Sequence, residues 1–267
     1  MTASALLGPA LWGLGAILSA STALWLVSVV RKDASIVDPF WAPGFLLVTG
    51  VYLARTGGSP RGWLVCALVA VWAVRLGSHL VRRNLAEGED ARYAAWREEH
   101  GPRFWWVSLF TVFWLQASIL WVVSAPLLAS VAGGGALDAW AVVGAVVALG
   151  GITLEAVADA QLRAFKERPD SAGTVLDSGL WRYSRHPNYF GNAVLWWGLW
   201  LVAVGVGAWW TAVGPAVMTL LLLRVSGVTL LERRLTETRP GYEAYVRRTS
   251  AFVPWPPRDR DPRGGTG

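Results

Sequence analysis

Seven runs of apolar residues constrain the fold of this 267-residue chain more than any other feature of its sequence. Several contain roughly 18 residues or more, which is enough for a helix to cross a hydrocarbon core of ~30 Å. Backbone polar groups in lipid must be satisfied within the segment, and the runs lack the alternation of barrel strands, so they are predicted to be helices. The predicted spans are Leu7–Val30, Phe40–Ala54, Trp63–Val81, Trp105–Val131, Trp140–Ala158, Tyr189–Val206 and Trp209–Leu223, of which the second and seventh are short.

The composition agrees with an integral membrane protein. Charged residues make up 16% of the chain, against ~25% in soluble domains, and the mean hydropathy is +0.40. Cys66 is the only cysteine, which excludes an internal disulfide and a cysteine metal cluster. The sequence contains no HExxH, GxGxxG or GxxxxGK[ST] pattern. We therefore predict an all-α polytopic membrane protein with about seven transmembrane helices and no metal site.

The distribution of basic residues predicts the orientation in the membrane. With seven spans, 21 of the 24 Lys and Arg residues fall on one side, in residues 31–39, 82–104, 159–188 and 224–267. Only Arg55 and Arg61 fall on the other side, and Arg75 lies within a span. We expect the N-terminus outside and the C-terminus in the cytoplasm. The basic residues then belong to cytoplasmic loops, and no nucleic-acid partner is expected.

We expect a single transmembrane domain over residues 1–253, because no long linker divides the chain. Polar residues gather in its second half, at about 140–253. Residues 254–267, rich in Pro, Arg, Asp and Gly, are expected to form a disordered tail. The first apolar run lacks a basic start and continues to Arg31, so we do not expect a cleavable signal peptide.

Polar residues within or beside the first four spans are candidates for function, because charges in a membrane are costly. Asp38, where the second span begins, is either a helix N-cap before a proline or an active-site acid. Arg75, His79 and Arg82 share one face of the third span. They are either a packed histidine with a snorkelling arginine, or an acid–base cluster if Asp38 faces them. Gln116 is expected to hydrogen-bond between helices.

A second group lies where the fifth span ends. Glu155, Asp159, Arg163 and Lys166 occupy one continuous helix face. The group is either a set of salt bridges on an exposed helix or a binding face. A face graded from acids to bases suits a ligand that carries both hydroxyls and phosphates, since ribose hydroxyls pair with carboxylates and phosphates pair with Arg or Lys.

The segment before the sixth span, residues 176–192, is dense in aromatic and hydrogen-bonding side chains. Pro187 is expected to start a helix, so that His186, Arg185 and the helix N-terminus would form an anion site. Further along, Tyr242 and Tyr245 share a face of a short amphipathic helix. That helix either contributes to the same site or lies on the membrane surface, with its tyrosines at the headgroups.

These motifs resemble the C-terminal domain of steroid 5-alpha-reductase-like membrane proteins, and the fuller set resembles a bacterial branch of that superfamily. The resemblance rests on His186-Pro187-Asn188-Tyr189-Phe190-Gly191, a Trp- and Gly-rich span, and then Glu232, Tyr242, Tyr245 and Pro254. Residues 37–41, 75–84, 88–93 and 247–254 extend it over almost the whole chain.

The resemblance implies a seven-helix fold that binds NADPH from the cytoplasmic side and reduces an activated carbon–carbon double bond in an apolar steroid, prenyl or lipid-like substrate. Asp38 stands where steroid reductases carry a glutamate that polarises the substrate carbonyl, and His79 stands near their tyrosine, so both are predicted catalytic residues. The predicted cofactor-binding residues are Asp159, Arg163, Lys166, Tyr183, Arg185, His186, Asn188, Tyr189, Arg224, Glu232, Tyr242 and Tyr245, in a cofactor-binding half at about 140–253.

Two other functions stay open at this point. Isoprenylcysteine and phospholipid methyltransferases of membranes share the Arg-His-Pro-x-Tyr-x-Gly pattern, which would imply S-adenosylmethionine in place of NADPH. Their late Glu-Glu pair reads Glu232-Arg233 here, and a cationic cofactor without phosphate has little use for Arg163 and Lys166. A non-catalytic lipid-binding protein is the third alternative. The expected function is an NADPH-dependent reductase of the inner (plasma) membrane, in contact with the lipid bilayer.

Overall fold

The computed structural model describes residues 3–171, 173–225, 232 and 239–258. Within these residues the secondary structure is helical and contains no β-strand, which confirms the predicted all-α class. The α-helices are α1 (Ala3–Arg31), α2 (Val37–Thr56), α3 (Pro60–Glu87), α4 (Ala91–His100), α5 (Phe104–Ser108), α6 (Leu115–Val123), α7 (Ala125–Gly133), α8 (Ala139–Lys166), α9 (Pro187–Val204), α10 (Val213–Leu220) and α12 (Tyr242–Arg248). Short π-helices, η2 (Leu109–Trp114) and η5 (Leu221–Val225), follow α5 and α10.

Five helices in the described part of the chain are long and apolar enough to cross a membrane, so the chain is a multi-pass membrane protein. They are Ala5–Arg31, Val37–Thr56, Pro60–Asn84, Ala91–Val123 and Ala139–Lys166. The sixth and seventh predicted spans coincide with α9, which has 18 residues, and with the shorter apolar helix Trp209–Arg224. The total of seven spans and their orientation stay predictions.

The fourth predicted span, Trp105–Val131, is not one continuous helix. The helix that covers its first part ends at Val123, and α7 begins at Ala125 after a turn at Ser124. Pro126 lies in the first turn of α7, and a proline cannot continue a preceding helix because it lacks the N–H and its ring meets an earlier carbonyl. The Ser124 hydroxyl occupies the break, where it donates to the Trp121 carbonyl at 2.7 Å.

The chain divides into two compact units. Unit 1 comprises residues 1–145 and 199–214, and unit 2 comprises residues 146–198 and 215–267. The chain therefore passes between the units within α8, α9 and α10. Asp38 and His79 belong to unit 1, whereas every predicted cofactor-binding residue belongs to unit 2.

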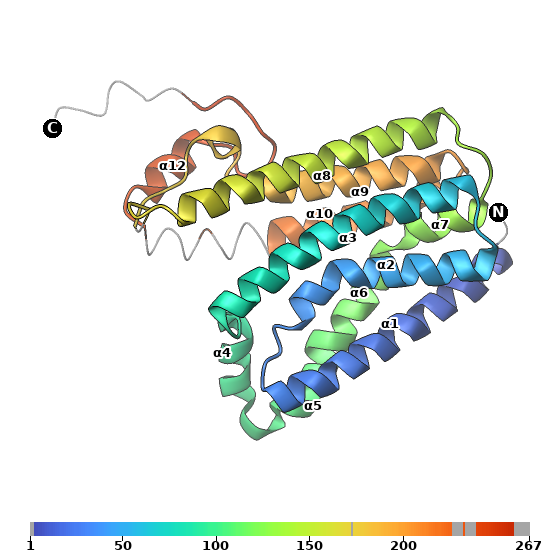
Figure 1. The fold of residues 1–267 in the computed structure, drawn as a ribbon, viewed down its shortest axis with the longest axis horizontal. Helices are drawn as coiled ribbons and strands as arrows, with labels where there is room; N and C mark the ends of the chain where they lie inside the picture. The colour runs from blue at the N-terminus through green and yellow to red at the C-terminus, as the bar shows by residue number, and fades with distance from the viewer. Residues whose placement is uncertain (1–2, 172, 226–231, 233–238, 259–267) are drawn as a thin grey trace. The chain divides into compact units, whose positions relative to one another are not determined.

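In unit 1, α1, α2 and α3 lie side by side (Figure 1). Their ends follow from local sequence. Gly57 ends α2 in the left-handed conformation, with φ of 89°, which costs glycine little. Ser59 caps α3 by accepting a hydrogen bond from the Gly62 amide, and Pro60 occupies the first helical turn.

Arg61, in the first turn of α3, forms an ion pair and hydrogen bonds with several other segments of unit 1. Its side chain is 3% exposed and forms an ion pair with Asp138 at 3.0 Å. It also donates to the carbonyls of Gly134, Ala136 and Val202, at 3.1, 3.1 and 2.9 Å respectively. A buried guanidinium requires this many acceptors, because its donors would otherwise lose the hydrogen bonds that water provides.

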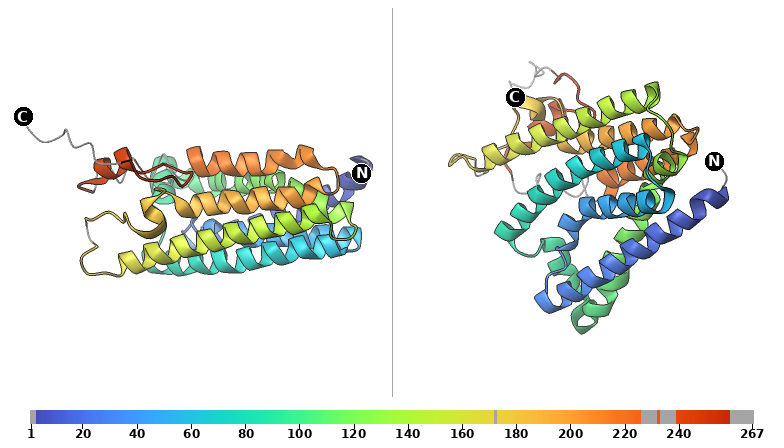
Figure 2. Two further views of the ribbon diagram at one scale, coloured as in Figure 1. Left: turned by 90° about the horizontal axis from the view of Figure 1, so that it is seen from above. Right: turned by 45° about the vertical axis from the view of Figure 1, so that its right-hand side comes forward.

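In unit 2, α8 and α9 pack backbone against backbone (Figure 2). A Cβ atom on Gly151 would lie 2.4 Å from the Leu195 nitrogen, and one on Gly191 would lie 2.6 Å from the Glu155 nitrogen. Only glycine permits this approach, as in other closely packed helices of membrane proteins. The contact fixes which side chains of the two helices face each other.

Candidate functional site

The first polar group, which we call the Asp38 cluster, lies in unit 1. Asp38 is in the first turn of α2. Its Oδ1 accepts a hydrogen bond from the Tyr93 hydroxyl of α4 at 2.8 Å, and the Gln116 amide of α6 donates to the same hydroxyl at 3.2 Å. Tyr93 is only 4% exposed. The three side chains therefore form a hydrogen-bonded chain across three helices.

Two arginines complete the Asp38 cluster from its other side. Arg92 donates to Asp38 Oδ2 at 3.1 Å, and Arg83 lies 3.7 Å from the same oxygen. Arg92 also pairs with Asp90, which caps α4. Burial opposes ionisation of Asp90, but its hydrogen bonds from Arg92 outweigh that effect and hold the pKa of the Asp90 carboxyl below its usual value. The cluster thus contains two carboxylates and two guanidinium groups.

The N-cap interpretation of Asp38 is wrong. The N-cap position of α2 belongs to Ile36, and Asp38 is the second helical residue, with its carboxylate directed to other elements. Within the described residues, Asp38 is hydrogen-bonded to Tyr93 and Arg92 and lies 3.7 Å from Arg83. His79 is half-buried on α3, and the hydroxyl that contacts Asp38 belongs to Tyr93.

The connections beside the cluster are held together by residues in the last turn of α3 and directly after it. Glu89 accepts a hydrogen bond from the Ala34 amide at 2.8 Å and pairs with Arg97 at 2.7 Å. Asn84 donates to the Ser35 carbonyl at 3.0 Å. These contacts attach the α1–α2 connection to the start of α4. They explain how Asp38 and Tyr93, 55 positions apart, become neighbours.

The second polar group, which we call the carboxylate–amide pairs, lies in unit 2. Asp159 on α8 accepts from the Asn188 amide of α9 at 3.0 Å, and Glu155 accepts from the Asn192 amide at 3.3 Å. The two acids are one helical turn apart, as are the two amides. Glu155, Asp159 and Asn192 are 4%, 6% and 5% exposed. This part of α8 is therefore not the exposed face of salt bridges that was one of the two predictions.

The basic end of the same α8 face differs from its acidic end. Arg163 and Lys166, in the last turn of α8, are exposed. In the part of the chain that the structure describes, neither side chain forms an ion pair. The face thus runs from buried acids to exposed bases within unit 2. Of the other predicted cofactor-binding residues, Arg224 lies exposed in η5 and Tyr183 is 43% exposed.

Arg185 and His186 are engaged with the C-terminal part of unit 2. Arg185 pairs with Glu232 at 2.7 Å and donates to the carbonyls of Val246 and Thr249. His186 is 1% exposed, and its Nε2 lies 3.2 Å from Glu232. The helix does start at Pro187, as predicted, but the guanidinium expected to bind an external anion already holds a carboxylate of the chain itself.

The electrostatics of this group follow from the same contacts. Burial disfavours the charged form of Glu232, but hydrogen bonds from His186 and Arg185 outweigh it and lower the pKa of the Glu232 carboxyl. Burial and the charge of Glu232 raise the pKa of the Tyr242 hydroxyl to about 12. Tyr189 stacks on the His186 ring, with centroids 5.5 Å apart. The group is therefore charge-paired and compact.

The two tyrosines of α12 face the protein. Tyr242 and Tyr245 are each 3% exposed, and the Tyr245 hydroxyl donates to the Trp181 carbonyl. The membrane-surface interpretation, with these tyrosines at lipid headgroups, is therefore wrong. The chain beyond α12 continues along unit 2, since the Trp255 amide donates to the Tyr183 carbonyl at 2.9 Å. Of the predicted tail, residues 259–267 lie outside the described residues.

Sequence reasoning missed the roles of Tyr93, Arg92 and Asn192. The first two belong to the stretch Gly88–Tyr93 that contributes to the family resemblance, which was a usable signal. Asn192 lies four residues after Asn188, at the spacing that matches Glu155 and Asp159 on the facing helix. Matching the two spacings could have found the second carboxylate–amide pair.

Together, the fold and these two polar groups define a polytopic all-α membrane protein, in which buried Glu155 and Asp159 bind amides and half-buried Asp38 binds a tyrosine. A family model described as "Protein of unknown function (DUF1295)" matches residues 24–249. The chain belongs to this family, and the matched stretch contains the Asp38 cluster and the carboxylate–amide pairs. No curated protein and no solved structure compared with the chain matches it.

Proposed function

We propose that the protein is an NADPH-dependent membrane reductase that acts on an activated carbon–carbon double bond in an apolar substrate. The observation that carries the proposal is the α8 face, which runs from the buried acids Glu155 and Asp159 to the exposed bases Arg163 and Lys166. A dinucleotide presents both hydroxyls and phosphates, and these two kinds of side chain bind them. Apart from residues 250–254, the motifs that resemble steroid 5-alpha-reductase-like proteins lie within the family match.

The residues of unit 2 fit such a cofactor. The Oδ1 atom of Asn192 is buried and has no hydrogen-bond partner among the described residues, so an acceptor is left over beside the carboxylate–amide pairs. Arg163 and Lys166 would hold phosphate groups, and Asp159 with Asn188 would hold ribose hydroxyls or the nicotinamide amide. Arg185 would orient Glu232 and would not bind a phosphate, because four of its five donors already serve Glu232 and the Val246 and Thr249 carbonyls.

When bound, NADPH would supply the hydride. The protein would supply a hydrogen bond to the carbonyl oxygen that is conjugated with the double bond. We assign that role to Asp38 in its protonated form, positioned by Tyr93, in place of a protonated Asp38 assisted by His79. Gln116 and Arg92 hold the two side chains in one orientation, so little reorganisation is needed when negative charge develops on the carbonyl oxygen.

The cofactor is tested by thermal stabilisation of the detergent-purified full chain with NADPH, NADH or S-adenosylmethionine. A ligand that binds only the folded state raises the melting temperature. We expect a shift with NADPH that weakens in Lys166→Ala and Arg163→Ala. Arg247→Ala is the matched control, because Arg247 is an exposed arginine of α12 with a side chain 72% exposed. A shift with S-adenosylmethionine alone would overturn the reductase and establish the methyltransferase class.

The role of Asp38 is tested by turnover of an enone substrate found by screening. We expect Asp38→Asn and Tyr93→Phe each to lower turnover by about 10²–10³-fold while the NADPH-induced thermal shift is retained. Full turnover in Asp38→Asn, with the cofactor still bound, would remove Asp38 from the mechanism. His79→Ala distinguishes the two assignments, since we now expect a smaller loss there than in Tyr93→Phe.

A further inference from the structure

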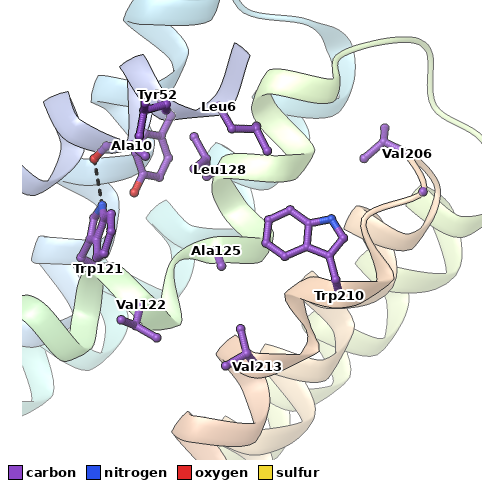
Figure 3. Close-up of a pocket in the computed structure, with 12 residues that line it drawn as sticks. Leu6, Ala10, Tyr52, Trp121, Val122, Ala125, Leu128, Val206, Trp210 and Val213 are labelled. Carbon is purple, nitrogen blue, oxygen red and sulfur yellow. Dashed lines mark hydrogen bonds between the residues drawn. The ribbon is translucent and has the colours of Figure 1, made fainter. Parts of the chain in front are cut away.

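Unit 1 contains a second feature that the proposed reaction does not use: an apolar cavity of about 550 Å³ (Figure 3). This volume is within the range of small-molecule sites. Its inner wall contains Ala10, Tyr52 and Leu128, which are at most 8% exposed. Its outer wall contains Val122 and Trp210, which are 38% and 48% exposed. The cavity therefore opens from the helix packing toward the lipid-facing surface of unit 1.

The polar side chains of the inner wall are already satisfied. The Tyr52 hydroxyl is hydrogen-bonded to the Ser124 hydroxyl at 2.8 Å. The Trp121 indole donates to the Ala10 carbonyl at 2.8 Å, as the dashed line in Figure 3 shows. A ligand with a polar group at depth would find no free side-chain partner there, and burying that group unpaired is costly. The deep part of the cavity therefore suits a plain hydrocarbon chain.

The cavity lies far from the Asp38 cluster. Tyr52 and Asp38 are both on α2, 14 residues apart in the sequence, which corresponds to about 21 Å at 1.5 Å per residue. That separation is most of a hydrocarbon core of ~30 Å. The cavity and the Asp38 cluster thus belong to opposite halves of the membrane-spanning part of unit 1, so the cavity is not the place where the proposed reaction occurs.

One exposed cation lies less than one helical turn beyond Tyr52 of the cavity wall, at the end of the same helix. Arg55 follows Tyr52 by three residues in the last turn of α2, is exposed, and lies over the Trp12 ring at 4.8 Å. Within the described residues, Arg55 forms no ion pair with a carboxylate. Exposed tryptophans accompany it, since Trp12 is 58% exposed and Trp210 48% exposed. Tryptophan and arginine at helix ends mark the depth of lipid headgroups.

From these observations we infer that the cavity binds one acyl chain of an anionic phospholipid, in the leaflet opposite the Asp38 cluster, with the phosphate at Arg55. The hydrocarbon chain fills the apolar cavity, and the cation of Arg55 selects a negatively charged headgroup at the depth of Trp12 and Trp210. This inference does not depend on the proposed reductase activity. The site makes the protein sensitive to the lipid composition of one leaflet.

The test is native mass spectrometry of the full chain in detergent, with phosphatidylglycerol or phosphatidylcholine added at equal concentration. We expect the wild type to retain one phosphatidylglycerol. Ala125→Trp, which fills the cavity, should lower the bound fraction about ten-fold or more. This is the effect expected when about two methylene groups of the acyl chain are no longer buried. Arg55→Ala should reduce the preference for phosphatidylglycerol over phosphatidylcholine by about five-fold.

The matched control is Val143→Trp, which adds the same side chain at an exposed position of α8 outside the cavity wall; Val143 is 49% exposed. It should bind phosphatidylglycerol like the wild type. The inference would be overturned if the Ala125→Trp variant melted like the wild type and bound phosphatidylglycerol as well as the wild type does. So would equal retention of free oleic acid and phosphatidylglycerol, because a fatty acid would then suffice.

A second measurement needs no variant, in case Ala125→Trp does not fold. Phosphatidylglycerol that carries a photoactivatable diazirine at the end of one acyl chain is irradiated with the wild type, and the labelled peptides are mapped. We expect label in the peptides that contain Ala10 and Leu128, which line the inner wall. Label spread over the exposed lipid-facing residues, without enrichment at those peptides, would contradict an acyl chain in the cavity.

Discussion

The carboxylate of Asp38 is held by side chains from other elements of unit 1, whereas the carboxylates of Glu155 and Asp159 face amides of one neighbouring helix in unit 2. Tyr93 and Arg92 of α4 reach Asp38 directly, and Gln116 of α6 donates to the Tyr93 hydroxyl. In unit 2, a glycine contact between α8 and α9 brings both carboxylate–amide pairs into register. The first arrangement depends on connections between helices, and the second depends on the distance between two helix backbones.

This difference predicts different sensitivities to mutation, and the largest expected effect is in unit 2. Gly191→Ala places a Cβ 2.6 Å from the Glu155 nitrogen and 2.8 Å from the Gly151 oxygen. Backbone atoms cannot rotate away, so α8 and α9 must separate, which we expect to cost about 1–3 kcal/mol of unfolding free energy. Thermal unfolding in detergent measures the loss, and NADPH binding should weaken with it.

Gly150 provides the control for that prediction. It is the neighbour of Gly151 on α8, and a Cβ there would meet nothing within 4 Å. Gly150→Ala should therefore be neutral or stabilise the helix by up to about 1 kcal/mol. Equal melting temperatures for Gly191→Ala and Gly150→Ala would show that the close contact does not set the geometry of unit 2.

The next effect concerns the hydrogen-bonded chain of unit 1. Tyr93→Phe leaves Asp38 Oδ1 and the Gln116 amide without their shared hydroxyl in a buried place, which we expect to cost about 1–3 kcal/mol. A double-mutant cycle with Gln116→Leu should be clearly non-additive, because both variants act on one network. Tyr183→Phe, at a position 43% exposed, should change stability by less than about 0.5 kcal/mol. Strict additivity in the cycle would mean that Gln116 is not part of the chain.

A smaller effect is expected where α4 begins. Asp90 accepts a hydrogen bond from the Arg92 amide and so caps the helix that carries Tyr93. Asp90→Ala should cost about 1 kcal/mol, and Asp90→Asn should cost less, since asparagine is also a good N-cap. The melting temperatures of the two variants measure the difference. If Asp90→Asn loses as much as Asp90→Ala, the charge of Asp90 matters more than the cap.

The smallest effect is a pH dependence in unit 2. Contacts with His186 and Arg185 lower the pKa of Glu232 below its usual value of 4.5. Its stabilising contribution is therefore complete above about pH 4.5 and is lost as the pH falls through the lowered pKa. Glu232→Gln should melt below the wild type at neutral pH, and the gap should close in acid. A gap that stays constant from neutral pH to about pH 3 would contradict an ionised Glu232 in the native state.

Hydrophobic pattern and turn chemistry predicted much of the fold. The predicted start of a helix at Pro187 is confirmed, and the first predicted span, Leu7–Val30, falls inside α1. The break at Ser124 was missed because its flanking residues are apolar and prolines occur inside membrane helices, so composition alone does not reveal it. Helical spacing also placed Glu155 and Asp159 on one face correctly, because such spacing is a local property.

Contacts between distant segments could not be predicted in the same way. Asp38 and Tyr93 belong to different helices, and their contact depends on how Glu89 and Asn84 attach the intervening connections. Arg185 was expected to meet an external anion, but its partner Glu232 lies 47 positions away. A charged side chain near a helix N-terminus predicts that an anion is bound there, but it does not say whether the anion comes from the chain or from a ligand.

The position of Arg61 has a mechanical consequence for unit 1. One guanidinium joins α3 to the Gly134 and Ala136 carbonyls, to Asp138 and to the Val202 carbonyl. Any displacement of α3 at this end must carry all of these segments along or break several charge-assisted hydrogen bonds together. This end of α3 is therefore the fixed end, and the amplitude of any opening grows along α3 toward Arg83 and the Asp38 cluster.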